Sequence, residues 1–220
     1  MKRLVPELSL ADPQAAADRI SHLLGADIDR EGDALRLTLG DQQLLLRAGT
    51  GAPSGPVHHV AFAVPDAAAA LAWAETRGAA LDTRMTPDGV TAIPEFWDRG
   101  VRVAFLQGPE GTRLELCAGR RAEIPEGLGH DHVGVLCTDL AATRATFLDA
   151  GLHEVAAVTL ARPEGATQVA FLAHGDQLVE LFQPPGPVPA PGPFTALRLE
   201  GAGREATLSG PDGLRLVLSP

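Results

Sequence analysis

An internal repeat constrains the fold of this 220-residue chain more than any other feature of its sequence. In three segments, a short apolar strand is followed by an aspartate, an alanine-rich helix, a glycine and further strands. Aspartate caps a helix well because its carboxylate accepts the free N–H groups of the first turn, and glycine ends a helix by adopting a left-handed conformation. These positions are Asp12, Asp66 and Asp139 before the helices and Gly25, Gly78 and Gly151 after them. Each segment therefore predicts one strand–helix–strand–strand–strand unit.

The repeat divides the chain into four units. The three complete units span residues 1–50, 55–118 and 127–183. A fourth unit, truncated because it has no helix, spans 194–220. It follows a Pro-rich connector, 184–193, which should be extended and stiff.

Composition and charge narrow the possible partners and the compartment. Acidic residues exceed basic ones, and the formal net charge of −10 argues against nucleic acid or an anionic membrane surface as a partner. No apolar run approaches the roughly 18 residues that a membrane span needs, and the first residues do not read as a secretory signal. Two cysteines, Cys117 and Cys137, cannot form a disulfide framework. We therefore expect a cytoplasmic protein.

A histidine occupies the same place in the opening strands of units two and three. Alternation along a strand puts His59 on one face with Ala61 and Ala63, and His132 on one face with Gly134. Small neighbours around a histidine leave room for something to bind. These two side chains are therefore candidate ligands.

The closing strands of the same two units each carry a glutamate between apolar residues. Glu115 lies in Leu-Glu-Leu and Glu180 in Val-Glu-Leu. Burial of an unpaired carboxylate is expensive, and a divalent cation would remove that cost. Either residue type alone would more often be a satisfied or solvent-facing side chain, but here the pair repeats. Two imidazoles and two carboxylates suit a divalent ion with open coordination positions, so the sequence predicts a metal site of His59, Glu115, His132 and Glu180.

Three further residues are candidate substrate contacts. Trp97 and Arg99 belong to a loop, residues 94–100, that gathers aromatic and charged side chains before a strand. The loop could be a lid over a site or, equally, a packed surface loop. Phe182 is predicted to share a strand face with Glu180 and to form an apolar wall beside it. No nucleophile elbow, P-loop or dinucleotide fingerprint is present.

Two other histidines neighbour the predicted ligands. Alternation turns His58 away from the His59 face, and His130 precedes the regular part of its strand. We expect structural or exposed roles for both.

These residues resemble the vicinal oxygen chelate superfamily, which includes glyoxalase I, methylmalonyl-CoA epimerase, extradiol dioxygenases and bleomycin resistance proteins. The resemblance rests on His59-Val-Ala-Phe, His132-Val-Gly-Val, the Asp-capped helices, Arg113-Leu-Glu-Leu and Leu178-Val-Glu-Leu. It implies an α+β fold in which tandem βαβββ units form cupped mixed β-sheets with helices outside, around a divalent metal. The family's ligand positions match the four residues already singled out.

The pairing of the units decides whether the four residues can meet. They meet if unit two pairs with unit three, and the resemblance to four-unit glyoxalases favours that arrangement. Units one and four would then form a degenerate second cup without metal. We expect a monomer or a homodimer.

The resemblance also suggests an activity. Extradiol dioxygenases resemble this pattern but use one carboxylate and usually a tyrosine, which the chain lacks entirely. Four ligands are more similar to the lyase and isomerase branch. We therefore expect a glyoxalase-like lyase or isomerase that takes a proton from a small chelating carbonyl substrate, with Glu180 or Glu115 as the base and Zn, Ni, Co, Mn or Fe as the metal. A small-molecule binding or resistance protein, or an extradiol-type dioxygenase, stays open as an alternative.

Overall fold

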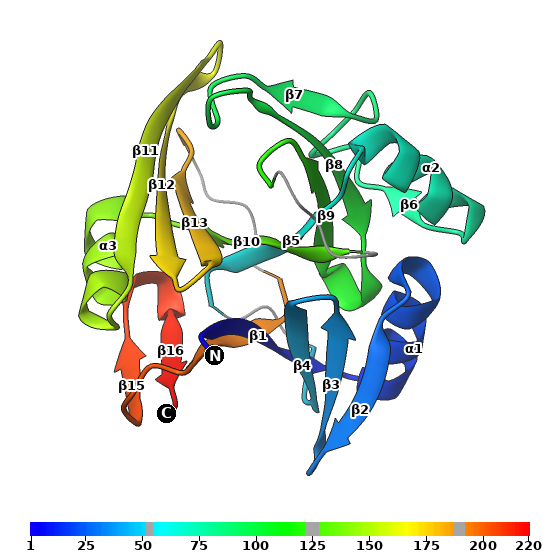
Figure 1. Ribbon diagram of the computed structural model, residues 1–220, viewed down its shortest axis with the longest axis vertical. Coiled ribbons are helices and arrows are strands. Elements are labelled where there is room, and N and C mark those ends of the chain that lie inside the picture. The colour runs from blue at the N-terminus through cyan, green and yellow to red at the C-terminus, as the bar shows by residue number, and fades with distance from the viewer. Residues whose placement is uncertain (52–54, 122–127, 187–191) are drawn as a thin grey trace.

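The computed structural model describes residues 1–51, 55–121, 128–186 and 192–220. Two mixed sheets lie back to back, and their concave faces open in opposite directions (Figure 1). Half of the predicted Pro-rich connector, residues 187–191, falls outside the described residues. Within the described residues, no helix is both long and apolar enough to cross a membrane.

The two ends of the chain build the seven-stranded sheet, in the order β15-β16-β14-β1-β4-β3-β2. Strand β1 pairs antiparallel with β14 and parallel with β4, so the first unit is joined to the last. The strands are β1 (Arg3–Leu10), β2 (Asp27–Glu31), β3 (Ala34–Leu39), β4 (Gln42–Ala48), β14 (Phe194–Glu200), β15 (Ala206–Ser209) and β16 (Arg215–Leu218).

The middle of the chain builds the nine-stranded sheet, in the order β11-β12-β13-β10-β5-β9-β8-β6, with β7 added beside β8. Its two halves meet where β5 pairs antiparallel with β10. The strands are β5 (Val57–Ala63), β6 (Ala80–Leu81), β7 (Thr91–Ile93), β8 (Val101–Gln107), β9 (Arg113–Ala118), β10 (Gly129–Leu136), β11 (His153–Arg162), β12 (Gly165–His174) and β13 (Gln177–Gln183). The expected pairing of unit two with three, and one with four, is therefore observed.

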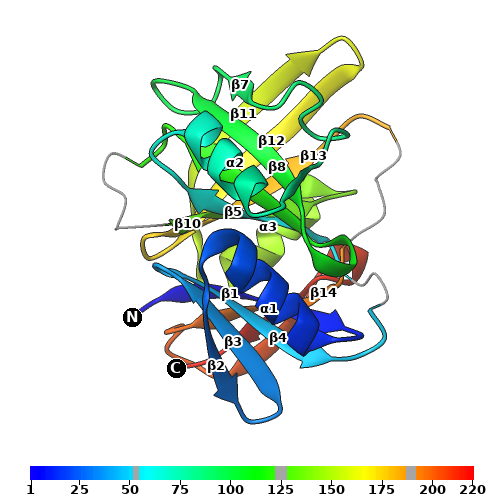
Figure 2. The same cartoon turned by 90° about the vertical axis from the view of Figure 1, so that its right-hand side faces the viewer.

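Three α-helices begin where the repeat predicts them: α1 (Pro13–Leu24), α2 (Ala67–Thr76) and α3 (Leu140–Asp149). Each follows an aspartate whose side chain accepts a hydrogen bond from a first-turn N–H group. The helices lie outside the two cups, with α2 beside the nine-stranded sheet and α1 beside the seven-stranded one (Figure 2).

One large apolar core joins the sheets and helices. It includes Leu8 of β1, Ile20 of α1, Phe62 of β5, Phe147 of α3 and Phe194 of β14, all fully buried. Because one face of each sheet is committed to this core, the opposite, concave faces are left for other roles. The predicted α+β fold class is confirmed.

Candidate metal centre

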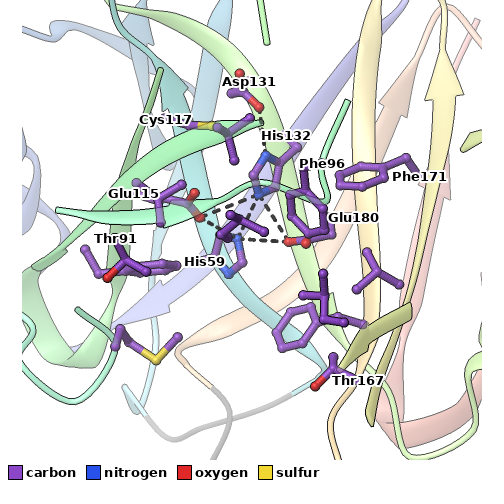
Figure 3. A pocket seen from close by; sticks show the side chains of 18 of the residues that line it. His59, Thr91, Phe96, Glu115, Cys117, Asp131, His132, Thr167, Phe171 and Glu180 are labelled. Atoms are coloured by element: carbon purple, nitrogen blue, oxygen red, sulfur yellow. Dashed lines mark hydrogen bonds and ion pairs between the residues drawn. The ribbon is translucent and has the colours of Figure 1, made fainter. Parts of the chain in front are cut away.

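The four predicted ligands converge on the concave face of the nine-stranded sheet (Figure 3). They come from four adjacent strands in the order β13-β10-β5-β9. The closing strands run parallel to the opening strands, and this register brings each glutamate beside the histidines. The residues are Glu180, His132, His59 and Glu115, in that strand order.

The distances between donor atoms suit a single ion. The Nε2 atoms of His59 and His132 lie 3.0 Å apart. A Glu115 oxygen lies 3.0 Å from His59 Nε2, and a Glu180 oxygen lies 3.2 Å from His132 Nε2. Ligands about 2.1 Å from an ion and at right angles to one another would be separated by about 3.0 Å. The donor atoms of His59, His132 and Glu180 all lie within 4.8 Å of one another, close enough to hold a metal ion. Glu115 is not in this group of three, although its oxygen lies 3.0 and 3.6 Å from the two Nε2 atoms.

Burial makes this cluster costly unless its charges are balanced. The exposed fractions are 3% for His59, 3% for Glu115, 4% for His132 and 8% for Glu180. Burial alone would lower the pKa of His132, but the two glutamates raise it well above its usual value. Burial alone would raise the pKa of Glu180, but the charges and hydrogen bonds of the two histidines lower it. A divalent cation among two imidazole nitrogens and two carboxylates would balance the same charges, so the donor set fits such an ion.

Two β-bulges position the histidines. The β5–β10 register shifts once beside His58 and once beside Asp131, so each of these is an extra residue on its strand. Both side chains consequently turn towards the neighbouring ligand candidate. His58 Nδ1 lies 2.9 Å from His59 Nδ1, and Asp131 Oδ1 lies 2.9 Å from His132 Nδ1. The expectation that His58 faces away from His59 is therefore wrong, because the bulge breaks the alternation.

These contacts fix which imidazole nitrogen faces the cluster. An Nδ1–H group of His132 that donates to Asp131 leaves the Nε2 lone pair pointing at the other three side chains. Asp131 is itself held from behind by Arg120, whose Nε lies 3.0 Å from Asp131 Oδ1. Sequence reasoning missed Asp131, although a polar residue directly precedes the ligand candidate in both opening strands.

His130 has a structural role, as expected, but it is buried rather than exposed. Its Nδ1 contacts the Gln42 side chain, and its Nε2 accepts a hydrogen bond from the Leu178 N–H group. The contact with Gln42 ties the nine-stranded sheet to β4 of the other sheet, and the bond from Leu178 joins His130 to β13 within its own sheet. Burial lowers the pKa of His130 to about 3, so the ring is neutral.

A cavity of about 210 Å³ lies over the four side chains. Two of the candidate substrate contacts, Trp97 and Phe182, line it. The third, Arg99, instead lines a separate surface groove that Trp97 also borders. Cys117 lines the cavity too, but burial raises the pKa of its thiol well above the usual value, which makes it a poor nucleophile.

Each glutamate faces a phenylalanine across its strand pair. Phe105 of β8 lies opposite Glu115, and Phe171 of β12 lies opposite Glu180. The sequence singled out an apolar wall beside Glu180 only. The structure gives both carboxylates the same aromatic neighbour, as the repeated Val-Ala-Phe-Leu of the two strands could have indicated.

The seven-stranded sheet repeats the strand arrangement without the donor atoms. By strand register, the positions equivalent to the four candidate ligands hold Val5, Leu45, Ala196 and Val217. These side chains offer a metal no ligand atom.

Comparisons with known proteins agree with this architecture. A sequence model of the Glyoxalase/Bleomycin resistance protein/Dioxygenase superfamily matches residues 58–171, just over half of the chain. None of the curated proteins compared by sequence matches the chain.

Solved structures show the same fold at low sequence identity. Glyoxalase I from Zea mays has a TM-score of 0.73 and 16% identity, with 99% of this chain and 92% of that chain covered. A putative dioxygenase from Bacillus subtilis has a TM-score of 0.61 and 14% identity, with 98% and 84% covered. At these identities the likeness shows the fold alone. The match to the superfamily's sequence model, in contrast, runs from β5 to β12 of the nine-stranded sheet, hereafter the cavity sheet. The chain therefore belongs to the Glyoxalase/Bleomycin resistance protein/Dioxygenase superfamily.

Proposed function

We propose that the protein is a metal-dependent lyase or isomerase of glyoxalase type. Its substrate is a small carbonyl compound that chelates the metal through two vicinal oxygens and loses a proton from the adjacent carbon. The observation that carries the proposal is the convergence of His59, Glu115, His132 and Glu180 beneath a largely apolar cavity. The tyrosine-free sequence and the second carboxylate favour this activity over extradiol-type oxygenation.

In this proposal the four side chains bind the metal, and one of the two glutamates also accepts the substrate's proton. The histidines and glutamates hold a divalent ion such as Zn, Ni, Co, Mn or Fe. When bound, the ion would polarise the substrate oxygens and stabilise the negative charge that develops on proton removal. The apolar walls exclude water from the carboxylates, which opposes the lowering of their pKa by the two histidines.

We assign the proton transfer to Glu180. Its oxygen lies 3.2 and 3.5 Å from the two Nε2 atoms, and that of Glu115 lies 3.0 and 3.6 Å from them, so the distances do not separate the two carboxylates. Glu180 is the more exposed, at 8% against 3% for Glu115. A more exposed carboxylate is better able to reach a substrate carbon. Glu115, its equivalent in the other unit, is the alternative base.

Two further assignments accompany the activity. The partner is a small molecule, since the cavity over the four side chains is small and largely apolar. The two free, buried cysteines suit a reducing compartment, and we infer the cytoplasm.

Metal analysis and proton exchange test the proposal together. Protein purified without chelator should contain a stoichiometric first-row divalent metal. A panel of 1,2-dicarbonyl, 2-hydroxycarbonyl and 2-acyl compounds should then be incubated with the metal-loaded protein in D₂O. NMR should detect deuterium at the carbon beside the carbonyl of at least one compound. Protein that binds no metal, or that exchanges no proton in any compound, would refute the proposal.

A further inference from the structure

Aromatic rings contribute several residues to the wall above the candidate metal centre. They are Phe96, Trp97, Phe105, Phe171 and Phe182. The Phe96 and Trp97 rings lie 5.1 and 4.9 Å from the Phe171 ring, so this part of the 94–100 loop packs against β12. Figure 3 shows Phe96 beside Phe171. Trp97 has a positive φ of 57°, a conformation that a large residue rarely adopts without support from its surroundings. The loop is thus held with its indole against the cavity.

The same wall offers no positive charge. Among the side chains of the described residues that line the cavity, none belongs to lysine or arginine. Its acidic members are Glu115, Asp131 and Glu180. Two glutamates balance a divalent ion, and Arg120 balances Asp131 from behind. The metal-loaded site would therefore have no surplus positive charge with which to hold a carboxylate or a phosphate.

Hydroxyl groups are the main neutral polar feature of the wall. Thr86 accepts a hydrogen bond from the Phe105 N–H group and is fully buried. Thr91 and Thr167 lie on opposite walls (Figure 3). The cavity volume of about 210 Å³ falls below the roughly 300–1,000 Å³ of pockets that enclose drug-sized ligands. Both its size and its polarity favour a compact ligand with little hydrogen-bonding capacity beyond the metal-bound oxygens.

We propose that this site selects an uncharged, compact substrate that has two vicinal oxygens at one end and an aromatic or branched hydrocarbon group at the other. Substrates that place a carboxylate or a phosphate against this wall are excluded, since Arg99, Arg120 and Arg121 line the separate groove beside Trp97 and not the cavity. This substrate class rests on the proposed function, because the vicinal oxygens need a metal. The rest of the substrate is selected by the aromatic residues of the cavity wall and by the lack of lysine and arginine among the described residues that line it.

Hydroxamates test the selection because they chelate a divalent metal through two adjacent oxygens. Zinc is first titrated into metal-free protein by calorimetry, and then benzohydroxamate, acetohydroxamate and 3-carboxybenzohydroxamate are titrated into the zinc-loaded protein. Benzohydroxamate should bind at least about tenfold more tightly than either of the others, since one lacks the ring and the other adds a charge. The proposal is overturned if either competitor binds within about twofold of benzohydroxamate.

A matched pair of variants tests whether charge is the cause. Thr167 lies at the half-exposed part of the β11–β12 hairpin, opposite Leu160. Thr167→Arg should improve binding of 3-carboxybenzohydroxamate by at least about threefold, whereas Thr167→Gln should leave it unchanged. Equal behaviour of the two variants would contradict selection by charge.

The sequence of titrations separates the two proposals. Protein that binds no zinc, or binds zinc and none of the hydroxamates, contradicts the proposed function. Protein that binds zinc and the hydroxamates, but prefers the charged or the ring-free probe, contradicts only the substrate class.

Discussion

Gly134 of β10 lies directly opposite His59 of β5, and a β-carbon on Gly134 would come within 2.0 Å of the His59 Cε1 atom. The small residue therefore makes room for the imidazole itself rather than for a ligand. Ala61 has the corresponding place opposite His132. The small side chains of Gly134 and Ala61 thus leave the space in which the two histidine rings lie across one antiparallel strand pair.

Gly134→Ala should displace the His59 ring and weaken metal binding. We expect zinc affinity to fall by about 10–100-fold, the size of effect seen when the support of a ligand is disturbed. Competition with a chromophoric chelator measures the affinity, and circular dichroism checks the fold. Ala61→Gly is the control, because it only removes a methyl group. Unchanged zinc affinity in the alanine variant would show that His59 is no ligand.

Asp131→Asn should weaken zinc binding without loss of the fold. The amide keeps the shape of the side chain, but it cannot stabilise the His132 Nδ1–H group as a carboxylate does, so we expect a loss of about 10–100-fold in affinity. Asp98→Asn makes the same charge change on the exposed part of the loop and should bind zinc like the wild type. Equal losses in both variants would point to overall charge rather than to positioning of His132.

Removal of the metal should lower the melting temperature. An ion that binds only the native state at 100 times its Kd adds about 2.7 kcal/mol to the free energy of unfolding. For a chain of this size we expect a decrease of about 5–10 °C on addition of EDTA. His132→Ala should melt at the same temperature with and without EDTA. If the wild type is equally insensitive, the native state gains no stability from a metal.

Glu180→Gln should separate metal binding from proton transfer. The amide oxygen can still ligate, but it cannot accept a proton, so we expect stoichiometric zinc and a decrease in turnover of about 100- to 10,000-fold on the substrate found by proton exchange. Glu115→Gln provides the comparison from the other unit. Near-full turnover of the Glu180 variant would assign the base elsewhere, and loss of turnover only in the Glu115 variant would assign it to Glu115.

His174 should make folding sensitive to acid. Its Nε2–H group donates to the Glu200 carbonyl at 2.8 Å, while its buried Nδ1 has no hydrogen-bond partner among the residues described. Burial lowers the pKa of His174, the bond to Glu200 opposes this, and Lys2 lowers the pKa further. Because the folded pKa lies below the unfolded one, the stabilisation is complete above about pH 6.5 and is lost as the pH falls below it.

Urea unfolding of wild type and His174→Gln at about pH 7.5 and about pH 5.5 measures this contribution. Other buried histidines, such as His58 and His130, contribute equally to both proteins, so their contribution cancels in the comparison. The wild type should lose more free energy of unfolding on acidification than the variant. The same loss in both would show that His174 titrates alike in the folded and unfolded chain.

The fold could be predicted from the sequence because the features that define the repeat each depend on only a few neighbouring residues. Aspartate before a helix and glycine after it act within a few residues, and alternation along a strand assigns faces without knowledge of the partner strand. For the same reason Glu115 and Glu180 were placed on the concave face correctly. Their role as ligands stays a prediction.

The bulges at His58 and Asp131 could not be predicted from alternation. A bulge depends on how two strands twist against each other, and no residue type requires one at these positions. The surface position of Arg99, one residue beyond Asp98, likewise depends on how the loop packs against β12. Local pattern therefore located the four converging side chains but not the groups that support them.

The two sheets differ in when their last strand is synthesised. The strands of the nine-stranded cavity sheet, β5 to β13, are consecutive in the chain, with no strand of the other sheet between them. In the seven-stranded sheet, the edge of β1 stays unpaired until β14 has been synthesised. The cavity sheet can thus be complete while the nascent chain still carries an unpaired strand edge, which is where misassembly between chains begins. The last three strands cover that edge, and a nascent chain that stalls before them would leave it exposed.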